Sequence, residues 1–186
     1  MNREIDNKTI LDKFAEKFCE IIERHTKYFI CSGFTAIAHG RTRGTEDIDM
    51  IIEKIPIEKF IQLHKELIRE EFECIQSDNP EVLFENYLNT GLSIRYVQAG
   101  KNFAPPEMEV KFAKGELDKE QLKTRKRYPM TSLNIYFSPI EATIAFKEES
   151  LKSQKDLDDA RHLRLIYQID EGEIKRIKRE IRKIKR

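Results

Sequence analysis

The spacing of hydrophobic residues predicts alternating helices and strands through the first 137 residues of the chain. Between Ile10 and Ile22, apolar residues recur at helical spacing, which is typical of a helix with one buried face. Short apolar runs bounded by polar residues or glycine indicate strands. Helices are therefore expected over Ile10–Ile22, Phe34–His39, Pro56–Ile68, Pro80–Leu88 and Glu116–Arg127, and strands over Tyr28–Cys31, Asp47–Ile52, Leu92–Val97, Met108–Phe112 and Leu133–Phe137.

The pattern changes after Pro139, because every later segment predicts a helix. Helices are expected over Ile140–Glu149, over Leu157–Tyr167 and from Glu173 to the C-terminus. Strands mixed with helices, followed by helices alone, are typical of an α+β fold. We therefore predict a mixed-sheet core with flanking helices over residues 1–137 and a helical C-terminal segment over residues 138–186.

Composition and charge describe the setting of the protein without identifying a partner. The chain of 186 residues is long enough for one domain with a buried core, and its 34 basic and 33 acidic residues nearly balance. No apolar run approaches membrane-spanning length, and residues Met1–Lys8 are too polar for a signal peptide. Cys19, Cys31 and Cys74 are odd in number and stand among apolar residues, which favours buried thiols in a reducing compartment. We therefore expect a cytoplasmic protein with no membrane partner.

Two aspartates on the second predicted strand are the first candidates for chemistry. Asp47 and Asp49 are two positions apart, so both carboxylates point to one face of the strand while Ile48 and Met50 point into the core. Two carboxylates held so close repel each other by roughly 1 to 4 kcal/mol, which a bound cation would offset. Ligands that are all oxygen favour magnesium or manganese over zinc. The pair therefore predicts a Mg²⁺ site, with Mn²⁺ as an alternative ion.

A second candidate feature is the turn at Ser32-Gly33, where a predicted strand ends and a helix begins. Such a turn presents backbone N–H groups and the positive end of the helix dipole to an anion. Glycine lets a phosphate approach the backbone, and the Ser32 hydroxyl can donate a hydrogen bond. Arg41 and Arg43 in the following loop are further phosphate ligands, although Arg43 can alternatively pair with Glu46. Together with the aspartates, this turn predicts a site for magnesium and a triphosphate.

The whole segment Cys31–Met50 resembles the signature of the DNA polymerase β-like nucleotidyltransferase superfamily. That signature is a hydrophobic residue, Gly, Gly or Ser, a spacer, and then Asp-hydrophobic-Asp-hydrophobic. Thirteen residues separate Gly33 from Asp47, within the usual spacing of the family. The run from His39-Gly40 through Arg43, Thr45, Asp47 and Asp49 is especially similar to the minimal nucleotidyltransferases of prokaryotes, which include abortive-infection type toxins.

Later segments extend this resemblance into the helical part of the chain. Ser138-Pro139-Ile140-Glu141 leading to Lys147, and then Lys155-Asp156-Leu157 with Asp159, are similar to the helical segment that follows the core in that group. The resemblance implies that Ser32, Gly33, Arg43, Thr45 and Lys147 contact the nucleotide. The residues themselves slightly favour Lys147 as a lysine on the helix surface. They also allow Asp156 and Asp159 to cap the helix and to pair with Arg161 or Lys155.

The resemblance also implies a third carboxylate on a neighbouring strand. The strand Leu92–Val97 carries Arg95 and no acid. In Glu107–Phe112 the apolar residues alternate toward the core, which leaves Glu109 and Lys111 on the open face. We expect Glu109 to be the third metal ligand and catalytic carboxylate beside Asp47 and Asp49, with Glu107 as the alternative.

The activity implied by the resemblance is transfer of a nucleoside monophosphate from an NTP to an acceptor hydroxyl, with release of pyrophosphate and two Mg²⁺ ions in the site. The acceptor stays open among RNA, protein and small molecules. Where the family usually has Gly-Gly or Gly-Ser, this chain has Ser32-Gly33. This departure leaves an alternative, a catalytically inactive nucleotide-binding protein or a component of a toxin–antitoxin pair.

The basic C-terminal helix allows a further alternative. Ile174, Ile177, Ile181 and Ile184 form a stripe at helical spacing, and Lys and Arg occupy most of the other positions. The helix can pack through this stripe and expose a solvated basic face. It can also contact RNA, because clustered positive charge binds phosphates without sequence specificity.

Overall fold

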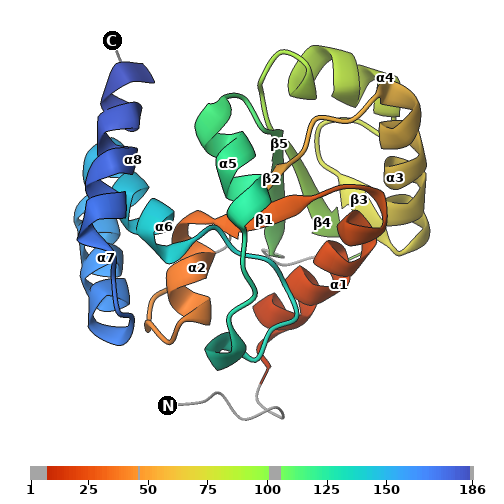
Figure 1. Cartoon of the computed structure of the whole chain (residues 1–186). Coiled ribbons are helices and arrows are strands. Elements are labelled where there is room, and N and C mark those ends of the chain that lie inside the picture. Colours follow the sequence, from red (N-terminus) through yellow and green to blue (C-terminus); the bar gives the residue numbers. More distant parts are fainter. Residues whose placement is uncertain (1–7, 46, 101–105, 185–186) are drawn as a thin grey trace.

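The computed structural model describes residues 8–45, 47–100 and 106–184. Among these residues, five strands form one mixed sheet in the order β1-β2-β5-β4-β3, with helices packed around it (Figure 1). The elements in chain order are α1 (Ile10–His25), β1 (Tyr28–Cys31), α2 (Ser32–Ala38), β2 (Asp47–Ile52), α3 (Ile57–Arg69), β3 (Phe72–Cys74), α4 (Pro80–Leu83), η1 (Phe84–Leu88), β4 (Ile94–Gln98), β5 (Glu107–Phe112), α5 (Glu116–Thr124), η2 (Pro129–Thr131), α6 (Ile140–Phe146), η3 (Lys147–Leu151), α7 (Gln154–Ile166) and α8 (Glu171–Ile184). The predicted α+β architecture is confirmed.

The centre of the sheet is the parallel pair β2 and β5. Each of these strands has an antiparallel neighbour on its other side, β1 beside β2 and β4 beside β5. Along both central strands every second residue is buried, as the two-residue period of a strand requires. These buried residues pack with aromatic residues of α1 and α3, such as Phe18 and Phe60, into the main core. The opposite face of β2 and β5 is therefore left for polar side chains.

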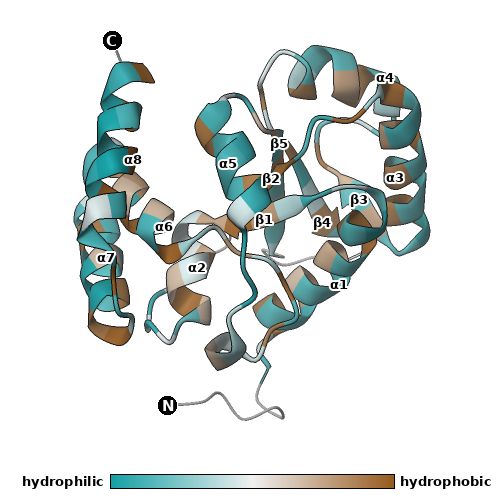
Figure 2. Ribbon diagram, viewed as in Figure 1, coloured by the Kyte–Doolittle hydropathy of each residue, from teal (hydrophilic) through white to brown (hydrophobic). Residues whose placement is uncertain are grey.

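A second apolar cluster joins the C-terminal helices. Helix α6 packs against α7 and α8, which stand on the side of the molecule away from α1 and α3 (Figure 1). The isoleucine stripe of α8 is buried at Ile174, Ile177 and Ile181 and exposed at Ile184. The outward turns of α8 are mainly hydrophilic (Figure 2). The apolar stripe therefore holds α8 on the body, while the domain boundary after residue 137 stays a prediction.

Two sequence expectations about strands are wrong. Leu133–Phe137 is not a strand: only Phe137 forms isolated bridges, with Ile30 and Lys126. The backbone N–H groups of Asn134 and Tyr136 donate to side-chain oxygens of Glu16 and Tyr28 instead of to a neighbouring strand. The short strand β3 was not expected, because its three residues are too few to show an alternating pattern.

No helix in the described part of the chain is long and apolar enough to cross a membrane. All three cysteines carry free thiols; Cys19 is a fully buried residue, whereas Cys31 and Cys74 are partly exposed residues. Burial raises the pKa of the Cys31 and Cys74 thiols too, so the expectation of buried thiols holds for Cys19 and Cys31 and in part for Cys74.

Candidate nucleotide and metal site

Five charged residues of β2 and β5 project from the open face of the sheet, and we call them the acid face. They are Asp47 and Asp49 of β2, and Glu107, Glu109 and Lys111 of β5. The parallel register places Asp47 opposite Glu107 and Asp49 opposite Glu109. Asp47 is exposed, whereas the side chains of Asp49 and Glu109 keep 30% and 13% of their accessible surface. The backbone therefore brings the sequence-predicted acids Asp47, Asp49 and Glu109 to neighbouring positions.

Two cations lie among these carboxylates. The ammonium of Lys111 pairs with Glu109 and lies 3.9 Å from an oxygen of Asp49. On the other side, the guanidinium of Arg95, in β4, lies 3.2 Å from Glu109 and 3.7 Å from Glu107. Sequence reasoning placed Arg95 and Lys111 on these strands but gave neither of them a part in the site. The alternation of Lys111 with Glu107 and Glu109 was the signal that could have identified that lysine, whereas the strand of Arg95 carries no acid and gave no such signal.

The environment shifts the pKa values of the central groups in opposite directions. Burial raises the pKa of Asp49, although a hydrogen bond from Ser32 and the charge of Lys111 oppose this shift. Burial also acts on Glu109, but its hydrogen bonds from Lys111, Ser93 and Arg95 prevail and lower its pKa. Burial disfavours the charged form of Lys111 as well, yet Glu109 and Asp49 hold its pKa above the usual range. Lys111 is therefore a charged ammonium at neutral pH.

The donor chemistry of the acid face fits a magnesium ion. Asp47 and Asp49 supply oxygen ligands from adjacent outward positions of one strand, as Mg²⁺ prefers. Within the described residues, however, no three His, Cys, Asp or Glu side chains converge as a ready metal site. Glu109 is turned to Lys111 and Arg95 instead. The fit therefore rests on the β2 aspartates, and Glu109 as a metal ligand stays a prediction.

The turn before α2 has an unusual backbone. Ser32 has a φ of 65°, in the left-handed region that favours glycine. At Gly33, an added Cβ would come within 3.1 Å of the Arg43 guanidinium, so glycine allows that side chain to lie against the turn. The turn thus brings Ser32, Gly33 and Arg43 together beside β2. The hydroxyl of Thr45 donates to the backbone carbonyl of Asp47 across 3.1 Å, at the entry to the same strand.

A cavity of about 310 Å³ opens beside Asp49 on the open face of the sheet. One wall consists of sheet and turn residues, including Ser32, Asp49 and Lys111, and the other of residues from α5, α6 and η3, including Lys147. The full lining is Phe29, Cys31, Ser32, Asp49, Ile51, Lys111, Asp118, Gln121, Ser138, Thr143, Phe146, Lys147 and Leu151. Apolar and polar side chains therefore share a pocket between the core and the C-terminal helices.

Lys147 belongs to a second group of charges, which we call the buried cluster: Arg41, Arg43, Lys147, Asp156 and Asp159. The side chain of Lys147 is only 1% exposed, so the interpretation as a surface lysine is wrong. Its ammonium lies 3.0 Å from Asp156 and 2.8 Å from Asp159. The hydrophobic residues around Lys147 in the sequence suggested a helix, but they could not show that the lysine itself points inward.

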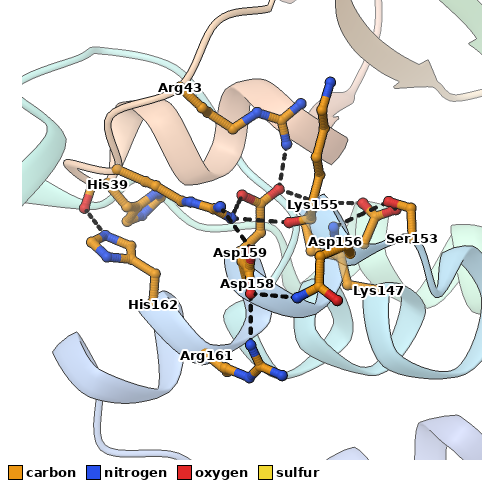
Figure 3. Close-up of polar contacts among 12 residues, drawn as sticks. His39, Arg43, Lys147, Ser153, Lys155, Asp156, Asp158, Asp159, Arg161 and His162 are labelled. Atoms are coloured by element: carbon orange, nitrogen blue, oxygen red, sulfur yellow. Dashed lines mark hydrogen bonds and ion pairs between the residues drawn. The ribbon is translucent and has the colours of Figure 1, made fainter.

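Asp159 is the centre of the buried cluster (Figure 3). Its carboxylate is fully buried and accepts from Lys147, from Arg43 at 2.6 Å and from Arg41. The expected pairing of Asp159 with Arg161 or Lys155 is wrong, because these three cations occupy its carboxylate and Arg161 pairs with Asp158. The helix cap is Ser153, whose hydroxyl accepts from the backbone N–H of Asp156. The cluster ties the loop after α2 to helix α7.

Two further sequence interpretations concern neighbours of this cluster. His39 is 2% exposed and its ring packs against Tyr128, Phe137 and Tyr167, so its interpretation as a packed structural histidine is confirmed. The suggested pairing of Arg43 with Glu46 involves a residue outside the described part of the chain.

Several basic residues of α8 form ion pairs with acidic residues of the neighbouring elements. Lys178 lies 2.6 Å from Glu148, Arg182 lies 2.7 Å from Glu149, and Arg176 pairs with Glu120 of α5. Lys175 and Arg179 are exposed on the outer side. Much of the charge that suggested RNA contact is therefore neutralised within the molecule.

Comparison with known proteins identifies the fold. No protein-family model and no curated protein sequence matches the chain. Among solved structures, it resembles the antibiotic-resistance factor ANT(2'')-Ia at 12% identity, with a TM-score of 0.54 over 92% of this chain and 93% of that one. It also resembles an antigenic nucleotidyltransferase-like protein from Paracoccidioides brasiliensis at 15% identity, with a TM-score of 0.56 over 88% and 79% of the two chains.

A third similar structure is MenT4, a nucleotidyltransferase toxin from Mycobacterium tuberculosis. Its TM-score is 0.51 at 15% identity, over 91% of this chain and 62% of that one. Identities at this level show a common fold and nothing finer. The chain therefore has the fold of nucleotidyltransferase-like proteins, as its first motif predicts.

Proposed function

We propose that this protein is a metal-dependent nucleotidyltransferase, which transfers a nucleoside monophosphate from an NTP to an acceptor hydroxyl and releases pyrophosphate. The observation that carries the proposal is the position of the Asp47–Asp49 pair. Asp47 and Asp49 project from one face of β2, and Asp49 opens onto a cavity that Ser32, Lys111 and Lys147 also line. That combination suits a magnesium-bound nucleotide.

Each residue has a definite part in this proposal. Asp47 and Asp49 would hold magnesium, whose charge would stabilise negative charge on the phosphates. Gly33 leaves room at the turn, and Arg43 beside it donates to the triphosphate. Lys147 lines the far wall of the cavity, and its ammonium pairs with Asp156 and Asp159 there. Such a site acts mainly by positioning the reactants and stabilising charge.

Ser32, Thr45 and Glu109 have supporting parts. The Ser32 hydroxyl opposes the burial that raises the pKa of Asp49 and so favours the charged carboxylate. Thr45 fixes the backbone where β2 begins. Glu109 is the proposed third carboxylate of the site. The free thiols are in keeping with a reducing, cytoplasmic setting, which we include in the proposal.

The second candidate function is nucleotide binding without transfer, as in an inactive member of the fold or a component of a toxin–antitoxin pair. It is favoured by the Ser32 side chain, which stands at the left-handed position beside Asp49 and faces the cavity. In this case NTP binding depends on magnesium, and no label moves to any acceptor.

The test is transfer of label from α-labelled NTPs, each with Mg²⁺, to total tRNA, to the protein itself and to aminoglycosides. We expect transfer by the wild type and a loss of about a hundredfold or more in Asp47→Asn/Asp49→Asn, because a metal contributes several kcal/mol to such a transition state. Glu116→Gln is the matched control, since that carboxylate lies on α5 and its side chain is 90% exposed.

Calorimetry with Mg²⁺ and each NTP separates the remaining outcomes. Magnesium-dependent binding without transfer to these acceptors supports the second candidate. Absence of both binding and transfer in the wild type contradicts both proposals. Transfer that survives the double substitution contradicts the assignment of the site.

A further inference from the structure

Lys111 lies within the acid face, among carboxylates whose mutual repulsion a metal ion would offset. Its ammonium contacts Glu109 and lies 3.9 Å from Asp49, so one cation lies near a carboxylate from each of the two central strands. The side chain is 36% exposed and lines the cavity beside Asp49. The ammonium supplies positive charge between Asp49 and Glu109, where a divalent ion would otherwise supply it.

The backbone fixes this arrangement. Lys111 follows Glu109 by two positions in β5, so both side chains must leave the same face of the sheet. In the parallel register Lys111 is opposite Ile51, directly beyond Asp49 on the same face of β2. A different rotamer of Lys111 would move the ammonium but would leave it on the acid face.

Arg95 completes the neutralisation of Glu109 from the other side. It is the cross-strand partner of Glu109 in β4, and its guanidinium lies 3.2 Å from that carboxylate. Glu109 therefore has two cations beside it, whereas no cation among the described residues lies within 4.0 Å of the exposed Asp47 carboxylate. The β5 carboxylates have the closer cation contacts, whereas on β2 Asp49 has only the 3.9 Å contact with Lys111, so the β2 pair is the better metal site.

We propose that the Lys111 ammonium takes the place of a second divalent cation, so that the site binds one metal ion, through Asp47 and Asp49, together with the nucleotide. The proposal rests on the proposed function and specifies its metal requirement. Glu109 then positions Lys111, and the ammonium supplies a fixed positive charge in the cavity beside Asp49. A divalent ion placed beside Lys111 would be repelled by it.

Mn²⁺ binding to the full chain, measured by electron paramagnetic resonance in the presence of a non-hydrolysable NTP analogue, tests this proposal. We expect one Mn²⁺ per wild-type chain at saturation. Lys111→Met removes the charge at similar length, and we expect it to bind a second Mn²⁺ at least about tenfold more tightly than the wild type does. Lys119→Met is the charge-matched control on the exposed side of α5 and should behave as the wild type.

The outcomes separate the two proposals. Two Mn²⁺ ions in the wild type, or unchanged binding in Lys111→Met, overturn the role of Lys111 and leave the nucleotidyltransferase proposal standing. No Mn²⁺ binding in any of the three proteins contradicts the proposed function itself. If Lys111→Met fails to fold, Lys111→Gln serves the same comparison, because it also removes the charge and keeps a polar end for the half-exposed position.

Discussion

The acid face and the buried cluster are both groups of five charges, yet they are built in different ways. The acid face lies on two adjacent strands and is open to solvent at Asp47. The buried cluster gathers residues from the loop after α2, from η3 and from α7, around an aspartate with no exposed surface. Local geometry produces the first group, and the packing of distant segments produces the second.

This difference predicts opposite effects on stability. At Asp49 the folded structure disfavours the charged form of the carboxyl, because burial outweighs the neighbouring cations. At Asp159 three cations surround one carboxylate, so removing it would leave buried positive charge without a partner. Removing the charge of Asp49 and removing that of Asp159 therefore compares a residue of the candidate site with a residue whose ion pairs stabilise the fold.

The largest effect is expected at Asp159. Asp159→Ala should lower the free energy of unfolding by about 3 kcal/mol, the lower end for breaking a buried ion pair, because Asp156 remains to pair with Lys147. Urea unfolding followed by circular dichroism measures the change. Asp158→Ala is the matched control on the preceding residue, whose side chain is 37% exposed, and it should change stability by no more than about 0.5 kcal/mol.

A loss below about 1 kcal/mol in Asp159→Ala would show that solvent reaches the cluster and screens its charges. The comparison with the acid face would then fail, because both groups would be electrostatically equivalent. Equal losses of stability in Asp158→Ala and Asp159→Ala would instead indicate that the effect comes from helix α7 and not from the buried charge.

The contrast also explains how far the sequence could be interpreted. The placement of Asp47 and Asp49 on one face of β2 follows from two-residue alternation, whereas a third carboxylate on a neighbouring strand, Glu109, was expected from the family resemblance. The burial of Lys147 did not follow, because its hydrophobic neighbours predict a helix but not which of its sides is covered by α7. Contacts over more than a hundred residues, such as Arg43 with Asp159, leave no local pattern.

Backbone geometry set a second limit. Ser32 was predicted at the turn, but its φ of 65° could not be inferred from a residue that usually avoids this region. Likewise, the backbone N–H groups of Asn134 and Tyr136 bond to side chains from distant parts of the chain, so an apolar run that is typical of a strand does not become one.

An intermediate effect is expected at Ser32, where the acid face meets the turn. Ser32→Gly relieves a left-handed conformation but loses the hydroxyl that bonds Asp49, so its stability should stay within about 0.5 kcal/mol of the wild type. Ser32→Ala loses the same hydroxyl and keeps the strain, and it should be about 1 kcal/mol less stable than Ser32→Gly. Urea unfolding of the two variants isolates the backbone contribution; equal stabilities would refute a strained turn.

The smallest effect, and the one of opposite sign, is expected at Asp49. Because burial raises the pKa of this carboxyl in the folded protein, the folded state binds the proton more tightly than the unfolded state does. The charged form therefore weakens folding at neutral pH, and Asp49→Asn should stabilise the metal-free protein by about 0.5 kcal/mol. The gain should be present above the acidic range and disappear as the pH falls and the wild-type carboxyl becomes protonated in both states.

Urea unfolding of wild type and Asp49→Asn at several pH values measures this difference directly, since all other carboxyls titrate in both proteins. Glu116→Gln again serves as the control, because its side chain is 90% exposed and its carboxylate lies outside the acid face. If Asp49→Asn destabilises the protein at neutral pH, then Ser32 and Lys111 stabilise the charged carboxylate more than burial penalises it. Asp49 would then resemble Asp159 as a contact that holds the fold, and the distinction between the two groups of charges would be lost.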